Sequence, residues 1–128
     1  MNQALNYIDE HLTGEIELNS AARFTGCSAW EFQRLFSFVT HTSLDEYIRG
    51  RRLALAADDI QNGGEKIIDI SMEYGYDSPA AFSRAFGRQY GVSPLSARSA
   101  GVTLTPYPRI TFQNLNEERH IMFTIMIL

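Results

Sequence analysis

The stretch SAWEFQRLF, residues 28–36, returns fifty residues later as SPAAFSRAF, residues 78–86. Both copies begin with serine, a good helix N-cap, and both place two phenylalanines four residues apart, on the same side of a helix. Arginine occupies the same position in each copy. The correspondence extends to Ser43 and Ser93, so the sequence predicts two similar helical units within one chain.

A tight turn precedes each copy of this stretch. Gly26 stands before the first and Gly75 before the second, and a small residue, Ala22 or Ser71, lies four positions ahead of each glycine. Two helices that cross at a tight turn need a small side chain at the crossing and a glycine where the chain reverses. Both halves are therefore predicted to be helix-turn-helix units.

Apolar periodicity and stop signals give the remaining helices. An amphipathic helix is predicted near the start, followed by the first helix-turn-helix at about 18–40, a linker helix at about 44–61 and the second helix-turn-helix at about 67–91. Gly50 inside the linker costs about 1 kcal/mol relative to alanine, so tertiary packing must hold that helix. The predicted class is all-α, with about seven helices and one domain over residues 1–100.

The character of the sequence changes after Ala100. Gly101, Pro106 and Pro108 are typical of a linker, and residues 109–113 and 121–128 have the pattern of strands. Residues 101–128 are therefore expected to be a linker and the truncated start of a β-containing domain.

The charge balance counts against a nucleic-acid partner, because the net charge is −4 and such proteins usually carry a basic patch. The charge is unevenly distributed. Residues 1–20 contain four acids and no Lys or Arg, whereas residues 21–100 contain nine acidic and nine basic residues. Any DNA contact would have to depend on a few well-placed arginines.

Catalytic and metal chemistry find no support in the sequence. Cys27 is the only cysteine, the three histidines are dispersed, and no cluster of His, Cys, Asp or Glu has metal-ligand spacing. Phosphate-binding loops and nucleophile elbows are missing. We predict no enzyme activity, no cofactor, no metal and no membrane insertion. The single cysteine and the lack of a signal peptide predict a cytoplasmic location.

Three strings resemble the AraC/XylS family: SAWEFQRLF (28–36), EYIRGRRL (46–53) and GYDSPAAFSRAFGRQYGVSP (75–94). The first is most similar to the MarA, SoxS and Rob subgroup. The resemblance implies a bacterial transcription regulator that binds an asymmetric duplex DNA site as a monomer through two recognition helices, and it allows RNA polymerase as a partner. In that subgroup the positions of Trp30, Gln33 and Arg34 approach base edges.

The second recognition helix departs from the family, which often places polar residues where this chain has Pro79 and Ala80. Ser78, Ser83 and Arg84 remain as candidates for base contact. Arginine can bond guanine with two parallel hydrogen bonds, and glutamine can do the same with adenine.

Phosphate contact is expected of two further residues. Ser28 lies at a helix N-terminus, where backbone N–H groups and the helix dipole favour anions, and Arg88 lies one turn beyond Arg84. The linker helix would span roughly 25 Å, and adjacent major-groove segments on one face of DNA are about 34 Å apart. We therefore expect the two recognition helices to enter adjacent segments.

The tail TPYPRITFQ, residues 105–113, resembles the opening of a GyrI-like effector-binding domain. If that domain is complete in the whole protein, the resemblance implies a small-molecule effector.

Other interpretations stay open. Trp30 could belong to the core, because helical aromatics are usually buried. Arg49, Arg51 and Arg52 in the linker could pair with Asp45, Asp58 or Asp59 rather than contact phosphate. The whole chain could also be an interaction or sensing module that has kept the fold with little DNA affinity.

Overall fold

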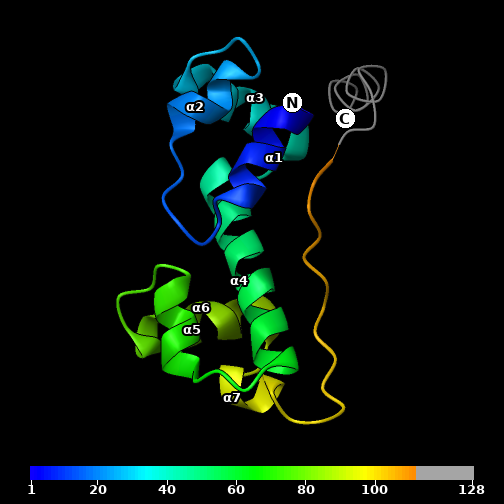
Figure 1. Cartoon of the computed structure of the whole chain (residues 1–128). Coiled ribbons are helices and arrows are strands. Elements are labelled where there is room, and N and C mark those ends of the chain that lie inside the picture. Colours follow the sequence, from blue (N-terminus) through cyan, green and yellow to red (C-terminus); the bar gives the residue numbers. More distant parts are fainter. Residues whose placement is uncertain (112–128) are drawn as a thin grey trace. The chain divides into compact units, whose positions relative to one another are not determined.

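The computed structural model describes residues 1–111, and within this part it contains seven helices and no strand (Figure 1). The helices are α1 (Asn2–Glu10), α2 (Leu18–Arg23), α3 (Ala29–Thr40), α4 (Leu44–Asn62), α5 (Ile67–Glu73), α6 (Pro79–Tyr90) and α7 (Pro94–Ala97). The all-α prediction is confirmed for the described residues. No helix among them is long and apolar enough to cross a membrane.

The chain divides into two compact units, and the division falls inside α4. Among the described residues, the N-terminal unit contains Met1–His11, Glu15–Ile48 and 109–111, and the C-terminal unit contains Leu12–Gly14 and Arg49–Pro108. Each unit therefore holds one pair of helices joined by a tight turn, α2 with α3 in the first and α5 with α6 in the second.

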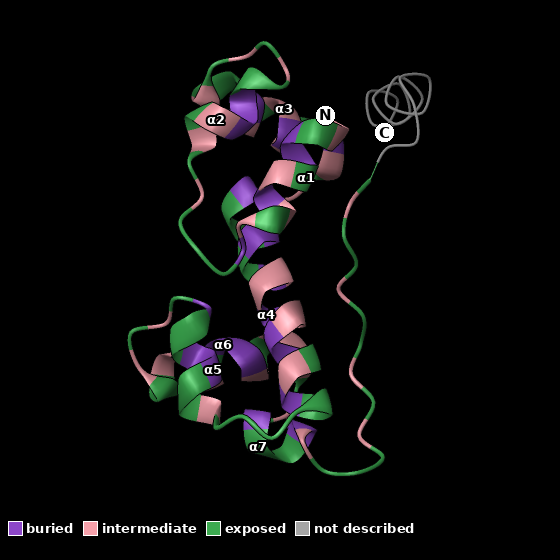
Figure 2. Cartoon of the chain, in the orientation of Figure 1, coloured by how far each residue is buried: buried purple, intermediate pink, exposed green. Residues whose placement is uncertain are grey.

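The N-terminal unit is built around two phenylalanines of α3. Phe32 and Phe36 are completely buried, and the ring of Phe36 lies 5.2 Å from that of Tyr47 on α4. Leu5 and Ile8 of α1 are buried as well. The spacing of apolar residues along each helix thus places one stripe inside and one outside, as Figure 2 shows.

The C-terminal unit repeats this arrangement. Phe82 and Phe86 of α6 are completely buried with their rings 5.7 Å apart, and Tyr90 continues the stack at 4.8 Å from Phe86. Leu53 and Ile60 of α4 belong to the same core.

The two turns have the chemistry that the sequence predicts. Gly26 and Gly75 take φ values of 75° and 84°, a left-handed conformation that favours glycine. Ala22 and Ser71 are buried at the crossing of each helix pair, and the Ser71 hydroxyl donates to the carbonyl of Ile68 at 2.7 Å. The polar side chain at the second crossing therefore has a partner.

Residues 102–111 adopt no regular secondary structure, so the predicted β-containing tail is not supported. Side chains of α4 bond this segment instead of a neighbouring strand. Gln61 Nε2 donates to the Val102 carbonyl at 2.9 Å, and the Ile110 N–H donates to Tyr47 Oη at 2.9 Å. The pattern of residues 109–113 was typical of a strand, but a strand needs a neighbour to complete its hydrogen bonds.

The rest of the predicted tail, residues 112–113 and 121–128, lies outside the described residues. Within the N-terminal unit, Arg109 Nη1 lies 3.6 Å from Asp9 Oδ2.

Candidate nucleic-acid interface

The outward face of α3 carries a stacked pair of side chains. Trp30 is 64% exposed, and the Arg34 guanidinium carbon lies 4.7 Å from the centre of its ring. The interpretation of Trp30 as a core residue is therefore wrong. A guanidinium over an indole face is held by a cation–π attraction of about 0.5–1 kcal/mol at an exposed site. The pair gives Arg34 a preferred orientation before any ligand is present.

Gln33 and Ser37 lie beside this pair. Together with Trp30 and Arg34 they line an open hollow on the helix surface. The Gln33 Nε2 donates to the Ala29 carbonyl at 3.3 Å, so a two-bond contact with an adenine would require this local hydrogen bond to be exchanged. Ser37 is the member of this group that the sequence did not single out, although it lies one turn beyond Gln33.

The N-terminus of α3 is closed by a capping box. Glu31 N–H donates to Ser28 Oγ at 3.1 Å, and Ser28 N–H donates to Glu31 Oε1 at 3.3 Å. The Ser28 hydroxyl proton remains available to an acceptor, but the Glu31 carboxylate opposes the approach of a phosphate. The spacing Ser-x-x-Glu in the sequence is the signal for this cap.

The N-terminus of α6 has the same serine cap without the acid. Ala81 N–H donates to Ser78 Oγ at 3.1 Å, and alanine occupies the position that Glu31 has in α3. Pro79 and Ala80 are both exposed. This end of α6 therefore offers an anion a helix dipole with no carboxylate from its own first turn.

The outward face of α6 is small and basic. Ser83 is half-buried, and Arg84 and Arg88 are exposed one turn apart. Burial raises the pKa of Tyr76, and the positive charges of Arg49, Arg52 and Arg88 oppose this shift. Arg88 is therefore close enough to Tyr76 to act on it electrostatically.

The linker arginines bond backbone carbonyls in the C-terminal unit. Arg52 donates through Nε to the Leu12 carbonyl and through Nη2 to the Gly14 carbonyl, both at 3.0 Å. Arg51 Nη1 donates to the Tyr107 carbonyl at 2.7 Å. These contacts support a structural role for Arg51 and Arg52, with backbone oxygens as partners where the sequence suggested carboxylates.

An acidic cluster lies in the C-terminal unit, where the carboxylates of Asp59, Glu65 and Glu73 come within 4.8 Å of one another. Partial desolvation and the charges of Glu65 and Asp59 raise the pKa of Glu73. Tyr74 Oη donates to Asp59 Oδ2 at 2.7 Å, and burial, that bond and the nearby carboxylates raise the pKa of Tyr74. The three acids come from separate segments, so sequence spacing gave no sign of them.

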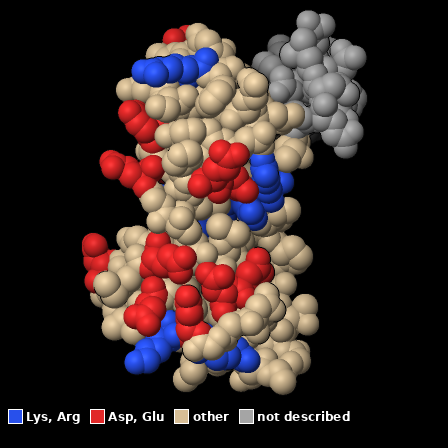
Figure 3. All heavy atoms as spheres, in the orientation of Figure 1, with Lys and Arg blue, Asp and Glu red and all other residues tan. Residues whose placement is uncertain are grey.

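Acidic side chains gather over the C-terminal unit on the face drawn in Figure 3. Because negative charge repels phosphate, a surface of this kind is unsuited to nucleic acid.

The chain matches the family model described as "Helix-turn-helix domain" over residues 21–100. It is 42% identical over 94 residues to the regulatory protein SoxS of Salmonella typhimurium. The alignment covers 73% of this chain and 88% of that protein.

Two solved structures share the fold. A transcriptional regulator from Chromobacterium violaceum, described as AraC-type DNA-binding domain-containing, aligns with a TM-score of 0.69 and 22% identity over 75% of this chain and 86% of that one. The DNA-binding domain of AdpA, solved in complex with a target DNA, aligns with a TM-score of 0.64 and 23% identity over 74% of this chain and 86% of that one. At these identities the likeness shows the fold alone.

Proposed function

The chain belongs to the AraC-type helix-turn-helix family of sequence-specific DNA-binding transcription regulators, and from this premise we propose that α3 and α6 enter successive major-groove segments with unequal roles. The observation that carries this proposal is the difference between two helices of the same register. Trp30 and Gln33 on α3 correspond to Ala80 and Ser83 on α6.

In this proposal α3 makes most of the base contacts. Arg34 is held by the Trp30 ring, so less rotamer freedom is lost when its guanidinium bonds a guanine. Gln33 contacts the neighbouring base after giving up its bond to Ala29. The exposed Trp30 ring adds apolar contact, for which a thymine methyl group is the suitable partner.

The second helix, α6, makes fewer base contacts in this proposal. Arg84 and the hydroxyls of Ser78 and Ser83 are its candidates for base edges, whereas Arg88 contacts phosphate. The small surface at Pro79 and Ala80 permits close approach of the helix to the DNA backbone. Ser28 is the phosphate contact of α3, through its remaining hydroxyl proton.

Two further partners belong to the proposal. RNA polymerase is the expected protein partner of a transcription regulator. A small-molecule effector rests on the resemblance of residues 105–113 alone.

The test is selection of bound duplexes from a random DNA library at fixed salt, with the wild type and the Arg34→Ala variant. We expect the wild type to enrich an asymmetric site with two blocks about one helical turn apart. Arg34→Ala should blur one block and leave the other.

An alternative outcome has a definite meaning. If no sequence is enriched over a range of salt concentrations, the chain is an interaction or sensing module of the same fold. Symmetric half-sites would instead contradict the proposed monomeric use of two different helices.

A further inference from the structure

Gly50 has close contact with the chain beyond the helix-turn-helix match. A Cβ on Gly50 would overlap Cζ of the Tyr107 ring, so the ring occupies the space that a side chain on α4 would fill. The family match ends at residue 100. The glycine in the middle of α4 therefore forms a slot for an aromatic ring from outside the matched region.

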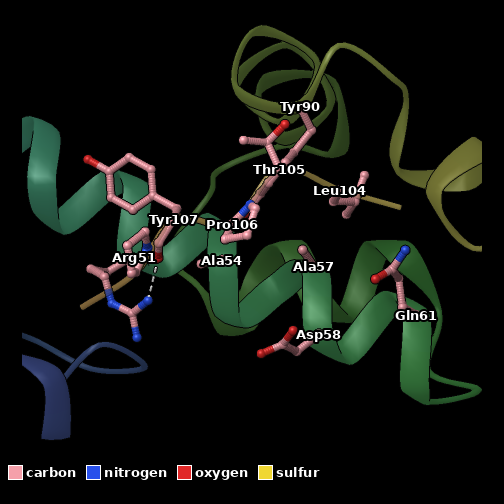
Figure 4. Close-up of a pocket in the computed structure, with 11 residues that line it drawn as sticks. Arg51, Ala54, Ala57, Asp58, Gln61, Tyr90, Leu104, Thr105, Pro106 and Tyr107 are labelled. Atoms are coloured by element: carbon pink, nitrogen blue, oxygen red, sulfur yellow. Dashed lines mark hydrogen bonds between the residues drawn. The ribbon is translucent and has the colours of Figure 1, made fainter. Parts of the chain in front are cut away.

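Two hydrogen bonds and an apolar contact fix the segment around that ring. Arg51 Nη1 donates to the Tyr107 carbonyl (Figure 4). Gln61 Nε2 donates to the Val102 carbonyl. Leu104 packs against the core of the C-terminal unit. The segment is thus held at its beginning, its middle and its end.

The end of α6 lies beside the same segment. Gln89 Nε2 on α6 donates to the carbonyl of Gly50 at 3.1 Å, and Tyr90 lines the same hollow of about 280 Å³ as Tyr107. Burial raises the pKa of Tyr90, which agrees with its half-buried position in this hollow. Arg51 and Gln61 also line the hollow, and both donate hydrogen bonds to backbone carbonyls of the segment.

We propose that residues 102–108 form a strap that docks on α4 through the slot at Gly50 and stabilises the C-terminal end of α6. The description of α6 as a recognition helix rests on the proposed function. The docking of the strap on α4 does not. Displacement of the strap would then be transmitted to the second recognition helix.

The test is a double-mutant cycle of Gly50→Ala and Tyr107→Ala in the full chain, with Gly87→Ala as the matched control. Gly87 lies inside α6 and a Cβ there meets nothing within 4 Å, so the control should gain helix propensity alone. That gain corresponds to about a fivefold rise in the folded-to-unfolded ratio. Urea unfolding followed by circular dichroism measures it without DNA.

If the strap docks in this way, Gly50→Ala raises the folded-to-unfolded ratio only in the background of Tyr107→Ala. In the wild-type background the new methyl group expels the ring from its slot, and the loss of packing cancels the gain. An equal gain from Gly50→Ala in both backgrounds would show that the ring does not occupy the slot, and would overturn the proposal.

Amide hydrogen exchange tests the link to α6. The N–H of Gly91 bonds Gly87 at 2.8 Å, and the matched N–H of His41 at the end of α3 bonds Ser37 at 2.9 Å. Tyr107→Ala should accelerate exchange at Gly91 several-fold and leave His41 unchanged. Unchanged exchange at Gly91 would refute the claim that the strap stabilises α6, whether or not the chain binds DNA.

Discussion

The helices α3 and α6 share the two phenylalanines of their inner faces and differ on their outer faces. Their paired phenylalanines are all completely buried, and each helix begins at a serine cap and ends at a residue with positive φ. Their outer faces carry Trp30 and Gln33 in one case and Ala80 and Ser83 in the other. Packing constrains the paired phenylalanines to repeat, so we expect differences in function to lie in the outer positions.

The largest expected effect concerns the shared inner face. Phe36→Ala and Phe86→Ala should each lower the free energy of unfolding by about 3–5 kcal/mol, because each removes a fully buried ring. Urea unfolding followed by circular dichroism measures both. Markedly unequal losses would contradict the idea that the two units have equivalent cores.

The second effect concerns the outer arginines. Arg34→Ala should weaken binding to a selected site by roughly ten- to a hundredfold, which corresponds to the loss of a two-bond base contact worth about 1–3 kcal/mol. Arg84→Ala should cost less, because α6 lacks the supporting ring and glutamine.

Fluorescence anisotropy at fixed salt measures both affinities. Arg49→Ala is the control, since it removes the same charge from an exposed residue outside both recognition helices. An equal loss from Arg49→Ala and Arg34→Ala would mean that Arg34 contributes only its charge.

The third effect concerns the helix ends. His41 and Gly91 occupy matching C-cap positions with φ of 60° and 76°. His41→Gly should raise the free energy of unfolding by about 0.5 kcal/mol, because it relieves left-handed strain but adds entropy to the unfolded chain. Gly91→Ala should lower it by about 1 kcal/mol. Thermal unfolding of the two variants gives the signs, and a stabilising Gly91→Ala would refute the comparison.

The smallest effect at neutral pH is specific to the C-terminal unit. Burial raises the pKa of Tyr74, Tyr76 and Tyr90, all in that unit, above the ordinary value of 10.0. A raised pKa means that the fold favours the neutral phenol. This contribution is fully present below pH 10 and is lost as the pH rises through the folded-state pKa.

Urea midpoints between pH 8 and pH 11 test this expectation. The wild type should lose stability above pH 10, and Tyr74→Phe should lose less, because phenylalanine has no proton to release. Parallel curves for the two proteins would contradict the assignment of the pH dependence to Tyr74.

The repeated inner face explains why the all-helical fold could be predicted from sequence. Caps, apolar spacing and turn glycines act over a few residues, so Ser28, Phe32 and Gly26 indicate their local structure without knowledge of the rest. The predicted strand at residues 109–113 lacks such local determination. Its apolar pattern is typical of a strand, but in the described part of it the Ile110 N–H donates to the Tyr47 side chain and Arg109 lies near Asp9.

Contacts distant in sequence account for what the sequence could not give. Gly50 predicted only that something must support the linker helix, and the supporting ring lies 57 positions away at Tyr107. The sequence favoured a surface position for Trp30 but left a core position open, and its exposure decides for the surface. The acidic cluster around Glu73 likewise forms only when three segments meet.

The central claim, that α3 contacts bases more extensively than α6, is tested most directly by a cycle between protein and DNA. The wild type, Arg34→Ala and Arg84→Ala are each measured against the selected site and against versions with either block scrambled. We predict that scrambling the α3 block costs the wild type more than scrambling the α6 block, and that Arg34→Ala removes most of that difference. Equal costs for the two blocks, or a larger coupling for Arg84, would contradict the account.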